Sequence, residues 1–140
     1  MKLKKISLDI INSMNKNTLM DVLDIECIEV GDNFVKSRMP VGPKTHQPMG
    51  LLHGGASAAL IESIGSMGST LLIDLKKQRP VGIEINCNHI GSITNGHVIG
   101  TGTITHAGKT THVWTVDIHE EGSQRLICTG RLTVMIIEKK

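Results

Sequence analysis

The chain has 140 residues, of which 39% are hydrophobic and 20% charged, with a formal net charge of +2. This length and composition predict one globular domain with a single core. One Trp, one Phe and no Tyr leave no aromatic platform on which single-stranded nucleic acid could stack, so no nucleic-acid partner is expected.

The cysteines and the chain ends indicate a cytoplasmic protein. No apolar h-region follows the first lysines, no uncharged run is long enough to span a bilayer, and the terminal lysines are expected to be solvated tails. Cys27, Cys87 and Cys128 are widely separated in sequence. An odd number of cysteines without a CxxC motif is typical of reduced, buried thiols. No Cys or His pair has the spacing of zinc ligands, so no metal site is expected.

The N-terminal segment, residues 1–24, predicts a short helix over 7–14 and one further helical turn capped by Thr18. The apolar side of the first helix would carry Leu8, Ile10 and Ile11. Strands are expected at 25–30 and 34–39, joined by a hairpin turn. A proline- and glycine-rich irregular loop follows.

A long helix is predicted from residue 55 to residue 75. Its apolar stripe consists of Leu60, Ile64, Met67, Leu71 and Leu75. Its other faces carry small residues rather than charges, so the helix is expected to be buried all round. Gly65 and Gly68 each cost about 1 kcal/mol relative to alanine in a helix. Their presence predicts that strands pass very close to the helix.

Period-two patterns after residue 80 predict four further strands, at 81–88, 98–105, 111–119 and 126–137. The Asn95-Gly96 pair is a hairpin signal, and the four strands are expected to form a meander. We therefore predict a single α+β domain, residues 1–140, in which an antiparallel sheet wraps one long central helix. Such a sheet leaves an exposed edge, which favours dimerisation.

Glu62 is the only charged residue between His53 and Asp74. A glutamate on so apolar a helix is rarely without a partner or a function, although a helix face that reaches water would also accommodate it. His53-Gly54-Gly55 lies directly before the helix, where free N–H groups and the helix dipole favour an oxyanion. The alternative for this motif is a flexible loop without a catalytic role.

Glu62 follows Gly54 by eight residues, which is roughly 12 Å along a helix axis. Both groups are then too far apart to touch one carbonyl within a subunit. Either the substrate spans the gap, or the site forms across a dimer interface. Ser66, one helical turn after Glu62, can reach its carboxylate or bond to its own helix backbone.

Three stretches resemble a known family. They are 47–57 (QPMGLLHGGAS) followed by 62–66 (ESIGS), 81–89 (VGIEINCNH), and His112-Val113-Trp114. Together they resemble the hotdog-fold acyl-CoA thioesterases, in the PaaI-like branch of the 1,4-dihydroxy-2-naphthoyl-CoA and 4-hydroxybenzoyl-CoA enzymes. The resemblance implies the hotdog fold and hydrolysis of an aryl- or medium-chain acyl-CoA to free acid and CoA. It also implies no cofactor and a homodimer, assembled further into a homotetramer as a dimer of dimers.

The resemblance also implies a role for each catalytic residue. Glu62 would be the nucleophile or the general base for water, and the backbone N–H of Gly54 would polarise the thioester carbonyl. Gln47 and His53 would orient the carbonyl or the water, and Ser66 would hold the carboxylate or the water. Family members place these groups on two facing subunits.

Substrate and CoA binding are implied for two segments and two further glycines. These positions are Gly55, Gly82, His89, Ile90, Gly91, Ser92, His106, Ala107, Gly108, Lys109, Thr110 and Thr111. Lys109 would meet a CoA phosphate, although an ordinary hairpin turn with one exposed lysine explains the same residues. Close relatives have an arginine where this chain has Gly91. The phosphate contact is then missing or supplied elsewhere, and an acyl-carrier-protein thioester stays open as the substrate.

Two other functions fit the same elements. A hydratase or dehydratase of acyl thioesters also carries a carboxylate on the central helix, but it pairs it with an upstream histidine and lacks the HGG sequence. A non-catalytic acyl-CoA-binding protein is the third alternative. The acyl group would be selected by Met49, Met67, Leu71 and the N-terminal segment. Partly exposed positions without a catalytic role are expected for His97, His106, His112 and His119.

Overall fold

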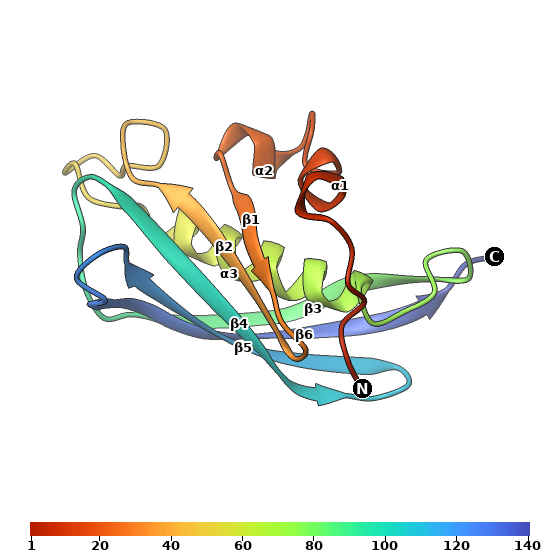
Figure 1. Cartoon of the computed structure of the whole chain (residues 1–140). Helices are drawn as coiled ribbons and strands as arrows, with labels where there is room; N and C mark the ends of the chain where they lie inside the picture. Colours follow the sequence, from red (N-terminus) through yellow and green to blue (C-terminus); the bar gives the residue numbers. More distant parts are fainter.

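The computed structural model describes all 140 residues and shows one sheet curved around one long helix (Figure 1). The strands are β1 (Glu26–Val30), β2 (Phe34–Pro40), β3 (Gln78–His89), β4 (His97–Ala107), β5 (Thr111–Glu120) and β6 (Leu126–Glu138). The helices are α1 (Leu8–Ser13), α2 (Leu19–Val22) and α3 (Gly54–Thr70). The predicted α+β architecture is confirmed, with antiparallel strands wrapped around α3. None of the helices has the length and hydropathy needed to span a bilayer.

The strand order is β1-β2-β4-β5-β6-β3, so the predicted four-strand meander is wrong. β4, β5 and β6 do follow one another, but β3 pairs with β6 instead of β4. Gly96 has a φ of +81°, and its carbonyl accepts the N–H of Val41. The Asn95-Gly96 turn therefore leads β4 toward β2 and closes no hairpin with β3. As a result β3 is an edge strand, and the side chains of Val81 and Ile83 are exposed.

The inner face of α3 forms the centre of the core, where Leu60, Ile61 and Ile64 are fully buried. The helix ends at Thr70 instead of continuing to Leu75, which is exposed. The carboxylate of Asp74 accepts the N–H of Lys76, and such a local bond competes with helix continuation. The remaining residues of the predicted apolar stripe are buried as expected.

The two mid-helix glycines of α3 make room for side chains of the sheet. A Cβ on Gly68 would overlap the indole of Trp114, and a Cβ on Gly65 would overlap Leu132. The glycines do allow tight packing of the sheet against the helix, but the predicted close passage of the strands themselves is wrong. The space is occupied by large side chains and not by strand backbone.

The terminal lysines are exposed as predicted, but the N-terminal residues pack against the domain and do not form a free tail. Leu3 is buried, and the N–H of Lys4 donates to the carbonyl of Leu71 at 3.0 Å. The predicted apolar side of α1 is also wrong, because Ile11 is buried while Leu8 and Ile10 are exposed. The face of α1 that carries Ile11 points toward β1. There the Asn12 side chain makes two hydrogen bonds to the backbone of Cys27.

An irregularity at Ile83 changes which face of β3 looks toward α3. Gly82 pairs with Val134, but Glu84 pairs with Thr133, so Ile83 is an extra residue in the strand. A bulge of this kind shifts the alternation of side chains. Gly82, Cys87 and His89 consequently all lie on the helix side of the sheet.

Candidate active site

Glu62 lies half-buried in the middle of α3, with its carboxylate against the backbone of β3. A Cβ on Gly82 would overlap the Glu62 carboxylate. Burial raises the pKa of Glu62, and no hydrogen bond or neighbouring charge opposes that shift. A carboxylate with a raised pKa is a stronger base. Ser66 lies one turn further along but makes no hydrogen bond to Glu62 within the protomer.

A cavity of about 380 Å³ opens beside Glu62, between α3 and the N-terminal segment. Its lining consists of Met14, Thr18, Leu19, Met20, Glu62, Ser63, Ser66, Met67 and Thr70. Met67 and the N-terminal segment, which are predicted to select the acyl group, line this cavity. Met49 and Leu71 do not line it, because Met49 is 81% exposed in a loop and Leu71 is buried in the core.

The start of α3 is capped by His53. Its Nδ1 accepts the N–H of Gly55 at 2.7 Å, and its carbonyl accepts the N–H of Ala56. The N–H of Gly54 has no acceptor in the protein. The free N–H expected at the start of the helix is therefore that of Gly54. Gly55 and His53 are hydrogen-bonded to each other and line a separate cavity of about 250 Å³.

A third cavity of about 420 Å³ collects several of the predicted residues. It is lined by Gln47, Leu51, Leu52, Gly54, Ser57, His89, Ile90, Gly91, Ser92 and Ile127. The side-chain oxygen Oε1 of Gln47 accepts the N–H of Met49, which leaves the side-chain NH₂ as a donor. The Nε2 atom of His89 lies 2.7 Å from the place of a Cβ on Gly54. A side chain at position 54 would therefore displace this ring.

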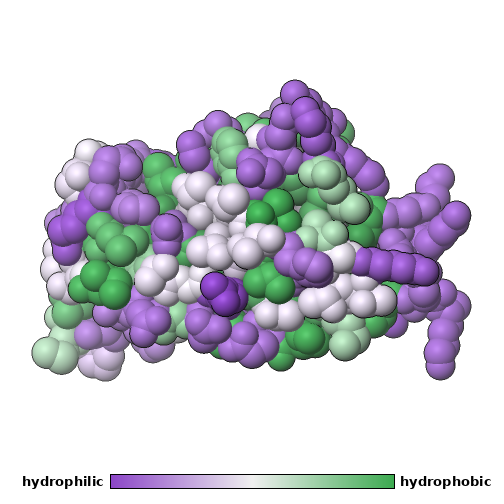
Figure 2. Space-filling view, turned by 90° about the horizontal axis from the view of Figure 1, so that it is seen from below, coloured by the Kyte–Doolittle hydropathy of each residue, from purple (hydrophilic) through white to green (hydrophobic).

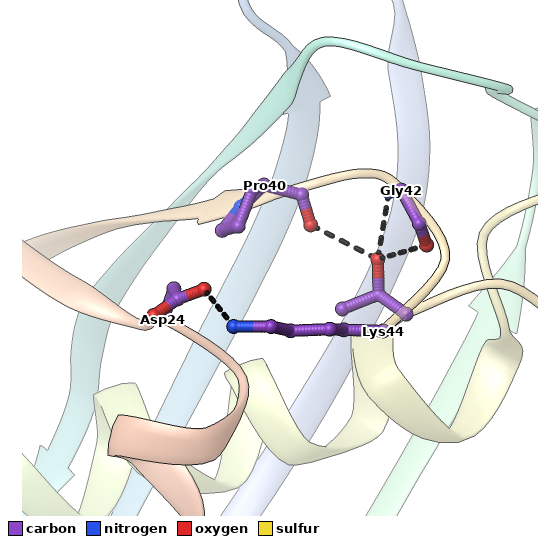
Figure 3. Close-up of polar contacts among 5 residues, drawn as sticks. Asp24, Pro40, Gly42 and Lys44 are labelled. Carbon is purple, nitrogen blue, oxygen red and sulfur yellow. Dashed lines mark hydrogen bonds and ion pairs between the residues drawn. The ribbon is translucent and has the colours of Figure 1, made fainter.

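The loop that carries Gln47 is held in place by the buried Thr45 and by an exposed ion pair (Figure 3). The Thr45 hydroxyl donates to the carbonyl of Pro40 at 3.0 Å and accepts the N–H of Gly42 at 3.2 Å. Lys44 forms an ion pair with Asp24 at 3.0 Å, which ties the loop to the segment after α2 (Figure 3). These contacts fix the loop without using the side chain of Gln47, whose NH₂ group makes no hydrogen bond.

The structure does not bring all the predicted residues together within one protomer. Glu62 and Ser66 line one cavity, while Gln47 and Gly54 line another. The two predicted CoA segments are also separated, because on β6 the partner of His89 is Cys128 and the partner of Thr111 is Met135. Those partners are 135 − 128 = 7 residues apart, or about 24 Å of strand. A single subunit therefore holds two incomplete halves of the predicted site.

Arg125 is a candidate residue that the sequence interpretation missed. Its Nη1 atom lies 2.9 Å from the place of a Cβ on Gly91, and its Nη2 donates to the carbonyl of Ser92 at 2.6 Å. The guanidinium thus stands beside Gly91, the position at which the family resemblance implies an arginine. No signal in the sequence connects a residue of the β5–β6 turn with the end of β3.

The prediction of a partly exposed His112 is wrong. Its side chain is buried, and its Nδ1 lies 3.0 Å from the hydroxyl of Ser69, which also accepts the indole N–H of Trp114 at 3.0 Å. Burial lowers the pKa of His112, which favours the neutral ring. The HVW stretch therefore contributes a polar contact inside the core, and none of its three residues lines the cavity of Glu62 or the cavity of Gly54.

Comparison with known proteins identifies the class. Residues 49–127 match the thioesterase superfamily. The chain is 42% identical over 134 residues to the 1,4-dihydroxy-2-naphthoyl-CoA hydrolase of Escherichia coli, covering 96% of this chain and 97% of that one. It is 38% identical to the proofreading thioesterase EntH of Cronobacter turicensis, with 96% of both covered.

A crystal structure of a mutant thioesterase from Pseudomonas aeruginosa has a TM-score of 0.95 at 36% sequence identity, with 99% of both chains covered. The chain belongs to the thioesterase superfamily and is a thioesterase of the hotdog fold. The predicted family and fold are confirmed.

Proposed function

We propose that the protein hydrolyses aryl- or medium-chain acyl-CoA thioesters at sites formed between two subunits. The observation that carries this proposal is the position of two groups along β3. The Glu62 carboxylate lies against Gly82, and Gly54, whose N–H is unpaired, lies beside the ring of His89. Both are on the helix side of the same free edge strand.

Antiparallel pairing of two β3 edges would complete the site. A two-fold axis through Asn86 places Glu84 opposite Asn88 of the partner subunit, and because Ile83 is the extra residue of the bulge, Gly82 then lies opposite His89 of the partner subunit. Glu62 then faces Gly54 of the partner subunit. The free edge of β3 and its exposed Val81 and Ile83 support this arrangement, because long unpaired edges are otherwise prone to aggregation.

The proposed reaction combines Glu62 of one subunit with the Gly54 N–H of the other. With Glu62 as general base, a water oxygen bonds to the thioester carbon while the carboxylate accepts its proton. The Gly54 N–H, helped by the amide of Gln47, stabilises the negative charge on the carbonyl oxygen. The C–S bond then breaks, and the proton on Glu62 passes to the leaving thiolate. A fixed donor to such an oxyanion contributes about 3–4 kcal/mol. Direct attack by Glu62 through an anhydride uses the same groups, and neither route needs a cofactor.

The cavity beside Glu62 is the proposed acyl pocket. Its 380 Å³ falls within the roughly 300–1,000 Å³ typical of small-molecule sites. Met14, Leu19 and Met67 supply an apolar lining that suits an aromatic or medium-length acyl group. Support for an aryl group also comes from the 42% identity to a protein named as a 1,4-dihydroxy-2-naphthoyl-CoA hydrolase. Arg125 and Lys109 are the cations proposed for the CoA phosphates.

A dimer of dimers is the proposed assembly. The face of the sheet away from α3 shows broad apolar and weakly polar areas among scattered hydrophilic side chains (Figure 2). Met135 is 41% exposed and lies on a strand of this sheet. Such a surface suits contact between two dimers. Sedimentation equilibrium of the purified chain measures the assembly directly.

The test of the shared site is subunit complementation. Glu62→Gln and Gln47→Ala should each abolish thiol release from an acyl-CoA. Heterodimers of the two variants combine one intact Glu62 with one intact Gln47 only if the site spans two subunits. Randomly mixed protomers should then recover about a quarter of the wild-type activity. Recovery of none, when mixed dimers are shown to form, would place the site within one subunit.

The substrate class requires a turnover screen. Aryl-, short-chain and long-chain acyl-CoAs, and the same acyl groups on acyl carrier protein, are compared by thiol release. The proposal expects the highest kcat/KM for an aryl- or medium-chain acyl-CoA. Dehydration of a 3-hydroxyacyl thioester without thiol release would instead favour a dehydratase. Tight binding without any turnover would favour a binding protein.

A further inference from the structure

Three ligand-type side chains meet where β3 pairs with β6. The ligand atoms of Cys87, His89 and Cys128 all lie within 4.8 Å of one another, and Cys87 Sγ is 4.0 Å from His89 Nε2. Cys87 and His89 are two residues apart on β3, and Cys128 is the direct register partner of His89 on β6. The period of the strand and the register of the pair therefore place all three on one face of the sheet.

A cation offsets the charge that two thiolates would bring to this cluster. Cys128 is fully buried, and two adjacent thiolates without a cation would repel each other in so poorly solvated a site. A divalent cation displaces both thiol protons to solvent and, with two thiolates and a neutral imidazole, gives a site of zero net charge.

We propose that Cys87, His89 and Cys128 bind a soft divalent cation of the zinc class. Two thiolates and an imidazole are ligands that select zinc over magnesium or calcium. Zinc bonds of about 2.3 Å to sulfur and about 2.0 Å to nitrogen put tetrahedral ligand atoms about 3.5–3.8 Å apart. The observed cluster reaches that geometry with side-chain shifts of about 1 Å. Three protein ligands leave a fourth position open to solvent.

The site adjoins the cavity that contains Gly54. His89 lines this cavity, and its Nε2 is the atom nearest to the place of a Cβ on Gly54. A cation that holds this nitrogen fixes the ring beside the proposed oxyanion donor and takes up space at the cavity wall, where the thioester carbonyl would have to enter. We therefore expect cation binding to lower the rate of thioester hydrolysis. This effect rests on the proposed function, whereas the binding itself does not.

Cobalt(II) alone is the probe for binding. The reduced, metal-free full-length chain is titrated with Co²⁺, and thiolate-to-cobalt charge-transfer absorption is recorded together with the visible bands of tetrahedral cobalt. One Co²⁺ per chain should bind, and Zn²⁺ should displace it. Absence of the charge-transfer band in folded protein would overturn the site. A band that saturates without the tetrahedral visible bands would also overturn it.

Variants locate the cation. Cys87→Ser, at a half-buried position, should remove most of the charge-transfer absorption and weaken Co²⁺ binding at least about tenfold. His89→Asn gives a second test that leaves the buried Cys128 in place. Cys27→Ser is the matched control, because Cys27 is a buried thiol near Glu29 and away from the cluster. A Cys87→Ser variant that binds Co²⁺ as tightly as the wild type would refute the assignment of Cys87 as a ligand.

Hydrolysis is measured separately. Zn²⁺ should inhibit the wild type at concentrations at which it displaces Co²⁺, and inhibition should require far more Zn²⁺ in Cys87→Ser. Binding without inhibition would confirm the cation site and overturn its coupling to hydrolysis. Loss of all thioesterase activity in metal-free protein would refute the proposed catalytic groups and leave the cation site standing.

Discussion

The carboxylate of Glu62 fits against β3 only because Gly82 has no side chain. A Cβ at position 82 would overlap Glu62 Oε1, and the strand has a bulge immediately after this glycine. The bulge and the bare backbone together let an edge strand lie directly over an acidic group of the central helix. Bulges next to active sites commonly re-aim side chains in this way.

Gly82→Ala should therefore displace the Glu62 carboxylate and lower kcat at least about tenfold, because misplacement of a catalytic group by about 1 Å is costly. Gly42→Ala is the matched control, since nothing lies within 4 Å of a Cβ at that position. It should keep nearly full activity. Steady-state thiol release with both variants makes the measurement. Equal activity of Gly82→Ala and the wild type would contradict the contact as a determinant of rate.

The pH dependence of the rate follows from the burial of Glu62. Burial raises the pKa of this carboxyl above its ordinary 4.5. Only the ionised form serves as base or nucleophile, so kcat/KM should fall as the pH drops through the raised pKa. The acidic limb should lie above the ordinary glutamate range. Measurement of kcat/KM from about pH 4 to about pH 8 locates this acidic limb. An acidic limb at or below 4.5 contradicts it.

The same shift in pKa makes a prediction about stability. Between 4.5 and the raised pKa, the folded chain binds more protons than the unfolded chain, so stability decreases as the pH rises through that window. Glu62→Gln removes the ionisation. This variant should have a higher Tm than the wild type at neutral pH, and the difference should close below 4.5. Calorimetry at neutral pH and at a pH below 4.5 tests this prediction. A difference in Tm that does not change with pH contradicts the raised pKa of Glu62.

Ser69 should contribute to stability through its two buried partners. Ser69→Ala leaves the Trp114 indole N–H and a nitrogen of His112 without a partner. The free energy of unfolding should decrease by about 1–3 kcal/mol. Ser63→Ala is the control, because its hydroxyl bonds only to the carbonyl of Ala59 in its own helix. Its effect should stay within about 0.5 kcal/mol. Urea denaturation compares the two, and similar losses would exclude the special role of Ser69.

Arg125 should affect binding of the nucleotide part of the substrate. Arg125→Ala should raise KM for an acyl-CoA roughly tenfold, since a guanidinium binds phosphate strongly. The same acyl group on N-acetylcysteamine, which has no phosphate, should show an unchanged KM. Arg131→Ala, which removes another exposed arginine, is the control. An equal rise in KM for both substrates would indicate a structural effect in place of phosphate binding.

The sequence predicted the parts of the fold that local patterns determine. The apolar stripe of α3, its glycines and the isolated Glu62 all follow from spacing along one helix. The separation of Glu62 from Gly54 also follows from helix geometry alone, and the structure places the two in different cavities.

The features that the sequence did not predict depend on long-range pairing. The Asn95-Gly96 pair is a valid turn signal, but the partner of β3 is chosen by contacts with β6, a strand that follows more than thirty residues later. The bulge at Ile83 shifts the faces of β3, so strict alternation fails there. The proximity of Cys87 to Cys128 and of Arg125 to Gly91 follows from the same pairing.

The cavity beside Glu62 has one wall on α3 and the other on residues 14–20, which belong to no strand. Leu19 is 62% exposed and Met14 is 45% exposed, so substitutions there cost the core little. The reacting groups, by contrast, are held by the helix and the edge of the sheet. On the proposed function, one wall of the acyl pocket thus lies on a stretch of chain that carries none of the reacting groups. A short exchange near the N-terminus can retune the substrate range while the hydrolytic apparatus stays untouched.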